Sequence, residues 1–136
     1  MQSAHYSIPL PHKRKENHII TTITSNTVKK ELPACPVETT LTLISDKWKV
    51  LILRDLLTGT KRFGELQRSI GHVSQKVLTS QLRQMEASGL LTRKVYAEVP
   101  PRVEYTLTEL GYSLKPIMDA MWTWGENYQA QNEKLQ

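Results

Sequence analysis

The sequence predicts a mainly α-helical domain that carries a small β-hairpin and a further long helix after it. Two observations predict this class. Apolar residues recur at helical spacing in successive segments between residues 36 and 88, and capping residues or glycines bound these segments. Beyond Gly89 the apolar spacing becomes alternating, as in strands, for two runs that a pair of prolines separates. Helical spacing then returns after Thr108.

Length and composition bound the class of protein further. The 136 residues suit one ordinary domain with a tail, and the single cysteine excludes an intrachain disulfide and therefore a disulfide-stapled secreted scaffold. No apolar run approaches the ~18 residues that span a bilayer, and the first residues lack the apolar stretch of a signal peptide. We therefore expect a cytoplasmic protein with no membrane partner.

The formal net charge of +5 is unevenly spread along the chain. Residues 1–34 hold five basic and two acidic residues, residues 61–105 hold eight and four, and residues 106–136 hold two and four. This distribution favours a basic binding face in the central segment and a separate assembly element after it.

Residues 1–34 differ from the rest of the chain. They contain three prolines, a basic run at residues 13–15 and few large apolar residues, so they cannot bury enough surface to offset the entropy of ordering. We expect a flexible basic tail, and the alternative is a basic arm that touches DNA phosphates. The folded domain is expected over residues 35–130, followed by a C-terminal tail at residues 131–136.

The first expected helix covers residues 36–44. Pro36 suits a first helical position, because its missing N–H group would have no partner there in any case. Val37, Leu41 and Ile44 follow at a spacing that places them on one apolar stripe.

Two further helices are expected before the middle of the chain. Asp46 can cap the first of them, which is apolar over so much of its surface that it should lie in the core, with Gly59 as its C-terminal cap. The second runs from about Phe63 to Ile70, and Gly71 ends it.

The helix expected over residues 74–88 carries the main functional signal. Ser74 opens it, and one side bears a buried apolar stripe. The opposite face is polar, and its only acidic residue, Glu86, lies at the far end. The residues of this face are Gln75, Lys76, Thr79, Ser80 and Arg83. Such side chains match the donors and acceptors on base edges in the major groove of DNA, so we expect them, together with Ser74 at the start of the helix, to contact bases or the adjacent phosphates.

A β-hairpin is expected over residues 91–107, with the stiff segment 98–102 at its tip. Arg93, Lys94 and Arg102 flank the tip. We expect these basic residues, together with Arg62, to neutralise phosphates, and Arg102 alternatively to enter a minor groove.

A last helix is expected after Thr108, with Pro116 kinking it near Tyr112. Its apolar stripe is larger than the core of a small domain can cover. Packing within one subunit is one interpretation, and we favour dimerisation.

The order of three helices, a polar helix and a hairpin defines a winged helix-turn-helix, in which the hairpin is the wing. Several segments also resemble the HxlR-type family of bacterial transcriptional regulators, which are relatives of the MarR-type proteins. The similar segments are Cys35–Val37, Asp46–Trp48, Leu51–Leu53, Lys61–Leu66, Val73–Thr79, Gly89–Leu91, Val99–Tyr105, Leu107–Gly111 and Trp124–Gly125.

This resemblance implies a homodimeric DNA-binding regulator whose terminal helices form the dimer. Two copies of the helix over residues 74–88 would then read half-sites of a near-palindromic operator about one duplex turn, ~34 Å, apart. Repression is the commoner outcome for a dimer that covers a promoter, so we expect a repressor.

Cys35 is the one residue with reactive chemistry. It precedes a helix start, where backbone N–H groups and the helix dipole favour a thiolate. Some members of the HxlR-type family sense oxidants or electrophiles through a cysteine at the matching position, so the resemblance implies redox sensing for Cys35. The alternative is a small buried apolar residue. An oxidant or a small molecule remains open as the inducer.

Other classes of protein receive less support. The sequence has no Gly-rich phosphate loop, no Ser/His/Asp grouping and no paired carboxylates, so we expect no enzyme and no cofactor. The number of possible ligands excludes a zinc site, unless histidines from the tails of two protomers combine. A winged-helix module that binds protein rather than DNA is the alternative, and the basic polar helix and hairpin argue against it.

Overall fold

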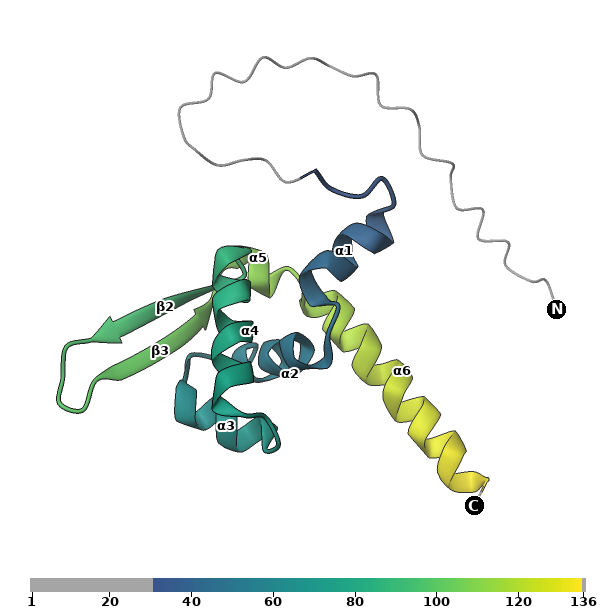
Figure 1. Ribbon diagram of the computed structural model, residues 1–136. Helices are drawn as coiled ribbons and strands as arrows, with labels where there is room; N and C mark the ends of the chain where they lie inside the picture. The colour runs from purple at the N-terminus through teal and green to yellow at the C-terminus, as the bar shows by residue number, and fades with distance from the viewer. Residues whose placement is uncertain (1–30, 136) are drawn as a thin grey trace, which may run out of the picture. The chain divides into compact units, whose positions relative to one another are not determined.

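The computed structural model describes residues 31–135 (Figure 1). The expected basic tail therefore lies almost wholly outside the described residues. The chain divides after Thr42 into two compact units, which we describe separately. The elements in chain order are α1 (Pro36–Ile44), α2 (Lys47–Leu56), β1 (Lys61–Arg62), α3 (Phe63–Ile70), α4 (Gln75–Ala87), β2 (Leu91–Tyr96), β3 (Arg102–Leu107), α5 (Glu109–Tyr112) and α6 (Lys115–Lys134).

Helix α1 begins at Pro36, as the sequence predicted. The Thr39 N–H donates to the Cys35 carbonyl over 3.0 Å, and the Thr39 hydroxyl donates to the Pro33 carbonyl over 3.0 Å. The expected apolar stripe is only partly buried, because Val37 and Leu41 are exposed and Ile44 alone is covered.

The second unit is built around α2. Asp46 caps this helix by accepting the Lys49 N–H over 2.9 Å, and α3 and α4 pack against it. Helix α2 ends at Leu56, so the expected cap Gly59 lies three residues beyond it, in a turn where its φ of 137° suits glycine.

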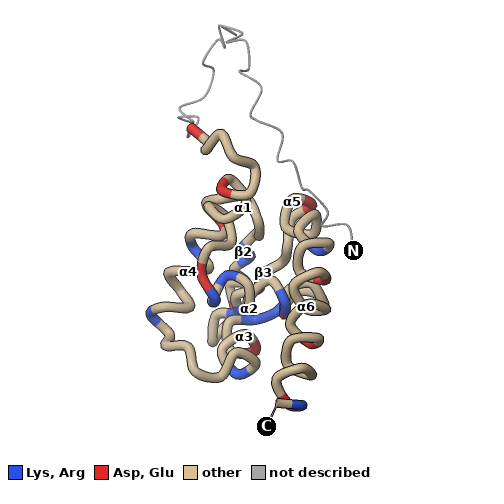
Figure 2. The backbone as a smooth tube through the Cα atoms, turned by 90° about the vertical axis from the view of Figure 1, so that its right-hand side faces the viewer, with Lys and Arg blue, Asp and Glu red and all other residues tan. Residues whose placement is uncertain are grey.

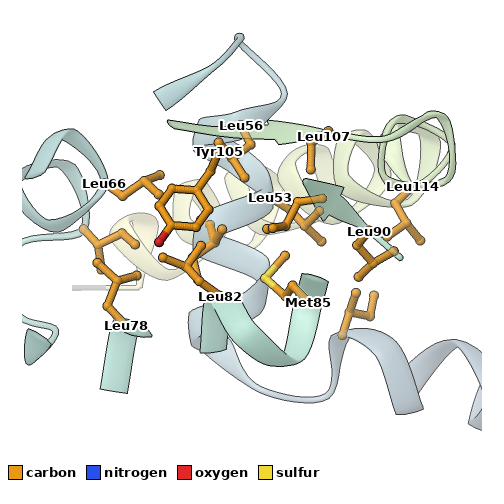
Figure 3. Packing of buried hydrophobic residues seen from close by; sticks show 14 of the residues in the cluster. Leu53, Leu56, Leu66, Leu78, Leu82, Met85, Leu90, Tyr105, Leu107 and Leu114 are labelled. Carbon is orange, nitrogen blue, oxygen red and sulfur yellow. The ribbon is translucent and has the colours of Figure 1, made fainter. Parts of the chain in front are cut away.

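The core of this unit is formed by side chains from α2, α3, α4 and the sheet (Figure 3). Leu53 and Leu56 of α2 lie in the same cluster as Leu82 and Met85 of α4, and all four are almost completely buried. Burying each such side chain stabilises the fold by roughly 1.5–3 kcal/mol. One side of α4 is therefore packed against the core, and its other side faces the solvent.

The sheet has three antiparallel strands in the order β1–β3–β2, whereas the sequence predicted only a two-stranded hairpin. The wing strands pair from Leu91 opposite Leu107 to Tyr96 opposite Arg102. The missed strand β1 is two residues long and exists because Lys61 and Arg62 pair with β3. It joins the start of α3 to the middle of strand β3.

The last part of the chain is two helices rather than the one kinked helix that was predicted. Helix α5 ends at Tyr112, and Pro116 lies in the first turn of α6. Proline has no N–H group and its ring clashes with the carbonyl four residues earlier, so the chain restarts a helix at this point. Helix α6 reaches Lys134, so residues 131–134, which were expected to be a tail, are helical.

Helix α6 packs against the core near its start. Leu114, the residue before the helix, is buried, and Met118 contacts the core. Further along, Trp122 lines a shallow hollow with residues of α2 and α3. No residue within α6 is buried, and its C-terminal half runs away from α2, α3 and α4 (Figure 1). Its acidic residues are spaced along its length (Figure 2). Among the described residues no helix is long and apolar enough to cross a membrane.

Candidate nucleic-acid interface

Helix α4 is held at both ends by its own neighbouring residues. Ser74 caps its start by accepting the Val77 N–H over 3.1 Å. At its end the Gly89 N–H donates to Glu86 and the Leu90 N–H donates to Met85, each over 3.0 Å. Gly89 has a φ of 78°, which this type of helix ending requires. The helix therefore has a defined length and direction.

The two sides of α4 differ as the sequence predicted. Leu78, Leu82 and Met85 are buried in the core. On the other side Thr79 is half-buried, and the remaining residues of the polar face, Gln75, Lys76, Ser80 and Arg83, are exposed. Ser74 is also exposed, although its hydroxyl oxygen is engaged as the cap.

The polar face lines a shallow groove along α4, which also includes Gln84. A second hollow continues from it towards the wing. Gln75, Thr79 and Arg83 line both, and Arg93 joins the second from β2. The structure therefore brings Arg83 and Arg93, which are ten residues apart, to one continuous surface with polar and apolar parts, which we call the α4 groove.

The other basic residues of the wing lie on its opposite face. In an antiparallel pair, directly opposed residues point to the same side. Arg93 is opposed to the buried Tyr105, whereas Lys94 is opposed to Glu104. The Lys94 ammonium lies 4.8 Å from the ring centre of Tyr96 on that second face.

Arg102 is engaged within the wing itself. Its guanidinium carbon lies 3.9 Å from the ring centre of Tyr96, and its nitrogens lie 3.4 Å from Glu98 and 3.6 Å from Glu104. Its side chain is 28% exposed. The positive charge of Arg102, which the sequence analysis expected to neutralise DNA phosphates, is thus paired with the carboxylates of Glu98 and Glu104. The role of Arg102 at a phosphate or in a minor groove stays a prediction.

Arg62 lies at the junction of β1 and α3. Its backbone N–H donates to Glu65 over 3.0 Å, which fixes the start of α3. Its side chain is exposed and lines a hollow together with Arg102 and the wing tip. The structure therefore groups Arg62 with Arg102, apart from the α4 groove.

Lys49 of α2 and Gln84 of α4 were missed by the sequence analysis. The Lys49 ammonium, on a side chain only 10% exposed, lies 3.1 Å from Asp46 Oδ2 and donates to Gln84 Oε1 over 2.8 Å. Burial raises the pKa of Asp46, but hydrogen bonds from the Lys49 N–H and ammonium, together with the charge of Lys49, lower it below its usual value. The sequence signal that could have identified Lys49 is its position beside the apolar run of α2, where a buried charge needs a partner.

Comparison with known proteins identifies the chain. The family model described as the HxlR-like helix-turn-helix matches residues 43–133, which spans α2 to α6. The chain belongs to the HxlR-like helix-turn-helix family. This result confirms the resemblance in the sequence and the winged-helix fold.

Individual relatives of this HxlR-like protein support the same assignment. The HTH-type transcriptional regulator YdeP of Bacillus subtilis (strain 168) is 45% identical over 106 residues, which cover 78% of this chain and 83% of YdeP. The redox regulator HypR in its oxidised form is 48% identical with a TM-score of 0.65, over 68% of this chain and 96% of HypR. The reduced form of the transcriptional regulator YodB from B. subtilis is 36% identical with a TM-score of 0.60, and the match covers 69% of this chain and 93% of YodB.

The HxlR-like chain is therefore a transcriptional regulator of the helix-turn-helix type, a family of regulators rather than enzymes. The family implies binding to DNA. Cys35 is an exposed free thiol next to the first residue of α1, in the first unit, so the alternative interpretation as a buried apolar residue was wrong. Within residues 31–135 no three His, Cys, Asp or Glu side chains are grouped as metal ligands.

Proposed function

We propose that this protein is a homodimeric, sequence-specific DNA-binding repressor that responds to oxidants through Cys35. Helix α4 lies in the major groove, and the wing lies on the sugar–phosphate backbone or in the adjacent minor groove. A repressor acts where the chromosome is, so the proposed location is the cytoplasm. An oxidant is the proposed inducer.

The observation that carries this proposal is the α4 groove. Its lining offers amide, hydroxyl, ammonium and guanidinium groups and no carboxylate. An ordinary solvated helix face would more often carry pairs of Glu and Lys. A surface without carboxylates suits a polyanion, and its mixed donors and acceptors suit base edges.

Dimerisation is proposed on the apolar face of α6. A shallow, mainly apolar hollow on this helix is lined by Pro116, Ile117, Ala120, Met121 and Trp124. Ile117, Met121 and Trp124 are 37%, 41% and 69% exposed, and Tyr128 continues the same stripe. A second copy of α6 is the occupant, because a two-fold axis would cover both stripes at once and would place two α4 helices symmetrically, as a near-palindromic operator requires.

The redox response is proposed at the exposed Cys35 thiol. With diamide, two Cys35 thiols lose two protons and two electrons to form one disulfide between subunits, and diamide is reduced to the hydrazine. Such a disulfide requires the two Cα atoms to lie within ~7 Å of one another. A mixed disulfide with a small thiol or alkylation by a quinone are the other products at a single cysteine.

Selection of binding sites from random duplexes tests the DNA-binding part. The proposal predicts enrichment of a near-palindrome with half-sites about 10 base pairs apart, bound by two protomers. Binding without any sequence enrichment contradicts sequence-specific reading. Absence of binding at 50 mM salt contradicts DNA binding altogether and favours the alternative of a protein-binding winged-helix module.

Operator affinity before and after diamide tests the redox part. Oxidation should lower the affinity of the wild-type protein and leave the affinity of Cys35→Ser unchanged. Equal affinities of the wild-type protein before and after treatment would remove Cys35 as the sensor, and an equal loss in Cys35→Ser would place the effect at another residue.

A further inference from the structure

A chain of hydrogen bonds leads from the start of α2 to the α4 groove. Asp46 lies 3.1 Å from the buried Lys49 ammonium, which donates to Gln84 Oε1 over 2.8 Å. Gln84 Nε2 then donates to Ser80 Oγ over 3.3 Å. Ser80 and Gln84 both line the α4 groove.

The buried lysine determines the direction of every bond in this chain. An ammonium group can only donate hydrogen bonds, so the Gln84 atom that faces it must be the carbonyl oxygen. The orientation of a glutamine side chain is otherwise ambiguous, because its oxygen and nitrogen are similar in shape. With Oε1 held by Lys49, the NH₂ group of Gln84 must face Ser80.

The consequence reaches the hydroxyl of Ser80. Because Gln84 Nε2 donates to Ser80 Oγ, the hydroxyl hydrogen of Ser80 is not used in this contact. No residue within the described range 31–135 accepts a side-chain hydrogen bond from Ser80. Ser80 is exposed, so its hydrogen is available to whatever enters the α4 groove.

We infer that Ser80 is a specificity-determining residue that the buried Lys49 and Gln84 hold as a hydrogen-bond donor. This inference rests on the proposed function, in which α4 lies in the major groove. There, Ser80 selects a base edge that offers an acceptor at its position, such as O6 or N7 of guanine or O4 of thymine. An amino group of cytosine or adenine could meet only the one lone pair that Gln84 leaves on Ser80 Oγ, and it would leave the hydroxyl hydrogen without an acceptor, so these edges are disfavoured.

The substitution Gln84→Glu reverses the direction of the last bond. A carboxylate at residue 84 still accepts from Lys49, and it also accepts from Ser80 because it has no N–H group. The Ser80 hydrogen is then consumed, and only oxygen lone pairs face the groove. The side chain keeps its size and its buried partner, so the fold should be retained.

The test is selection of binding sites from random duplexes with the wild-type protein, Gln84→Glu, Ser80→Ala and the double variant. One base position in each half-site should favour an acceptor edge by about 3- to 10-fold with the wild-type protein, and this preference should disappear with Ser80→Ala. With Gln84→Glu the same position should change towards cytosine or adenine. In the double variant the added negative charge should weaken binding overall without changing any base preference beyond that of Ser80→Ala.

The variant Lys49→Met provides an independent measurement, with thermal unfolding as the check that it folds. Loss of the ammonium leaves the Gln84 amide free to turn, so the preference at the same position should weaken while other positions are unchanged. Equal base preferences for the wild-type protein and Gln84→Glu at every position would overturn the inference, even though the proposed function would stand. Absence of any preference with the wild-type protein would instead contradict the proposed function.

Discussion

Gly111 of α5 lies against the backbone carbonyl of Leu90 at the base of the wing. A β-carbon at residue 111 would overlap this oxygen and would also lie 3.0 Å from Leu107 Cδ2. The same carbonyl accepts the Thr108 N–H over 3.0 Å, and the Thr108 hydroxyl donates to Gly89 over 2.6 Å. The end of α4, the wing and the start of α5 are thus fixed together, which sets the position of the wing relative to the α4 groove.

The substitution Gly111→Ala should therefore destabilise the protein by at least about 2 kcal/mol, because the backbone of Leu90 cannot move without breaking these bonds. Denaturant unfolding at one fixed protomer concentration measures this loss. Gly125→Ala is the matched control, since a β-carbon there meets nothing within 4 Å and the residue lies inside α6. It should stabilise the protein by about 0.5–1 kcal/mol. Equal effects of the two substitutions would contradict the close approach at Gly111.

The phosphate contacts of the α4 groove are tested by Arg83→Ala and Arg93→Ala. Each should weaken operator binding. Because the proposed dimer carries two copies of the residue, the slope of log affinity against log salt should fall by about 2 if each copy neutralises one phosphate. Arg68→Ala on α3 is the control, because Arg68 is exposed but does not line the α4 groove. A salt slope that is unchanged by all three substitutions would mean that neither arginine is at the backbone.

The dimer interface is tested by Trp124→Glu on the apolar face of α6. The side chain of Trp124 is 69% exposed and stacks on Tyr128 with ring centres 5.3 Å apart, so its loss should cost little within one protomer. Sedimentation equilibrium should nevertheless show a change from dimer to monomer, because a charge would be buried in the interface. Ala130→Glu adds the same charge on the other side of α6 and should leave the dimer intact. A dimer that survives Trp124→Glu would place the interface elsewhere.

The ion pair of Asp46 and Lys49 predicts a specific acid dependence of stability. The pKa of Asp46 is lowered in the folded protein, so its contribution is fully present above the ordinary value of 3.8 and is lost as the pH falls through the lower folded value. Asp46→Asn keeps an acceptor for the Lys49 N–H but removes the charge. Its free energy of unfolding should be below that of the wild-type protein at neutral pH, and the difference should narrow below about pH 4. Parallel curves from neutral to strongly acidic pH would contradict this account.

The parts of the fold that depend on local signals could be predicted from the sequence. Helix α4 is an example, because its cap at Ser74, its apolar stripe and its ending at Gly89 all lie within or beside the helix. The break between α5 and α6 also had a local signal in Pro116. It was interpreted as a kink because proline allows either outcome, and in the structure it opens a new helix.

Other features depend on partners that are distant in the chain. Strand β1 forms because Lys61 pairs with Tyr105, and two residues carry no strand pattern of their own. Lys49 is separated from Gln84 by 35 positions, so spacing could not connect them. The ion pairs of Arg102 did have a local signal, because Glu98 and Glu104 are close to it in sequence. The sequence analysis considered only the positive charge of Arg102 and therefore assigned it to DNA binding.

The central claim is that the outer face of α4 faces the floor of the major groove. Photo-cross-linking from single cysteines tests it most directly, with Thr79→Cys on α4 and Ala130→Cys on α6, each in a Cys35→Ser protein that carries an aryl azide on the new thiol. The account predicts adducts from position 79 on major-groove atoms of two half-sites about 10 base pairs apart, and none from position 130. Adducts from position 130 with none from position 79 would contradict it.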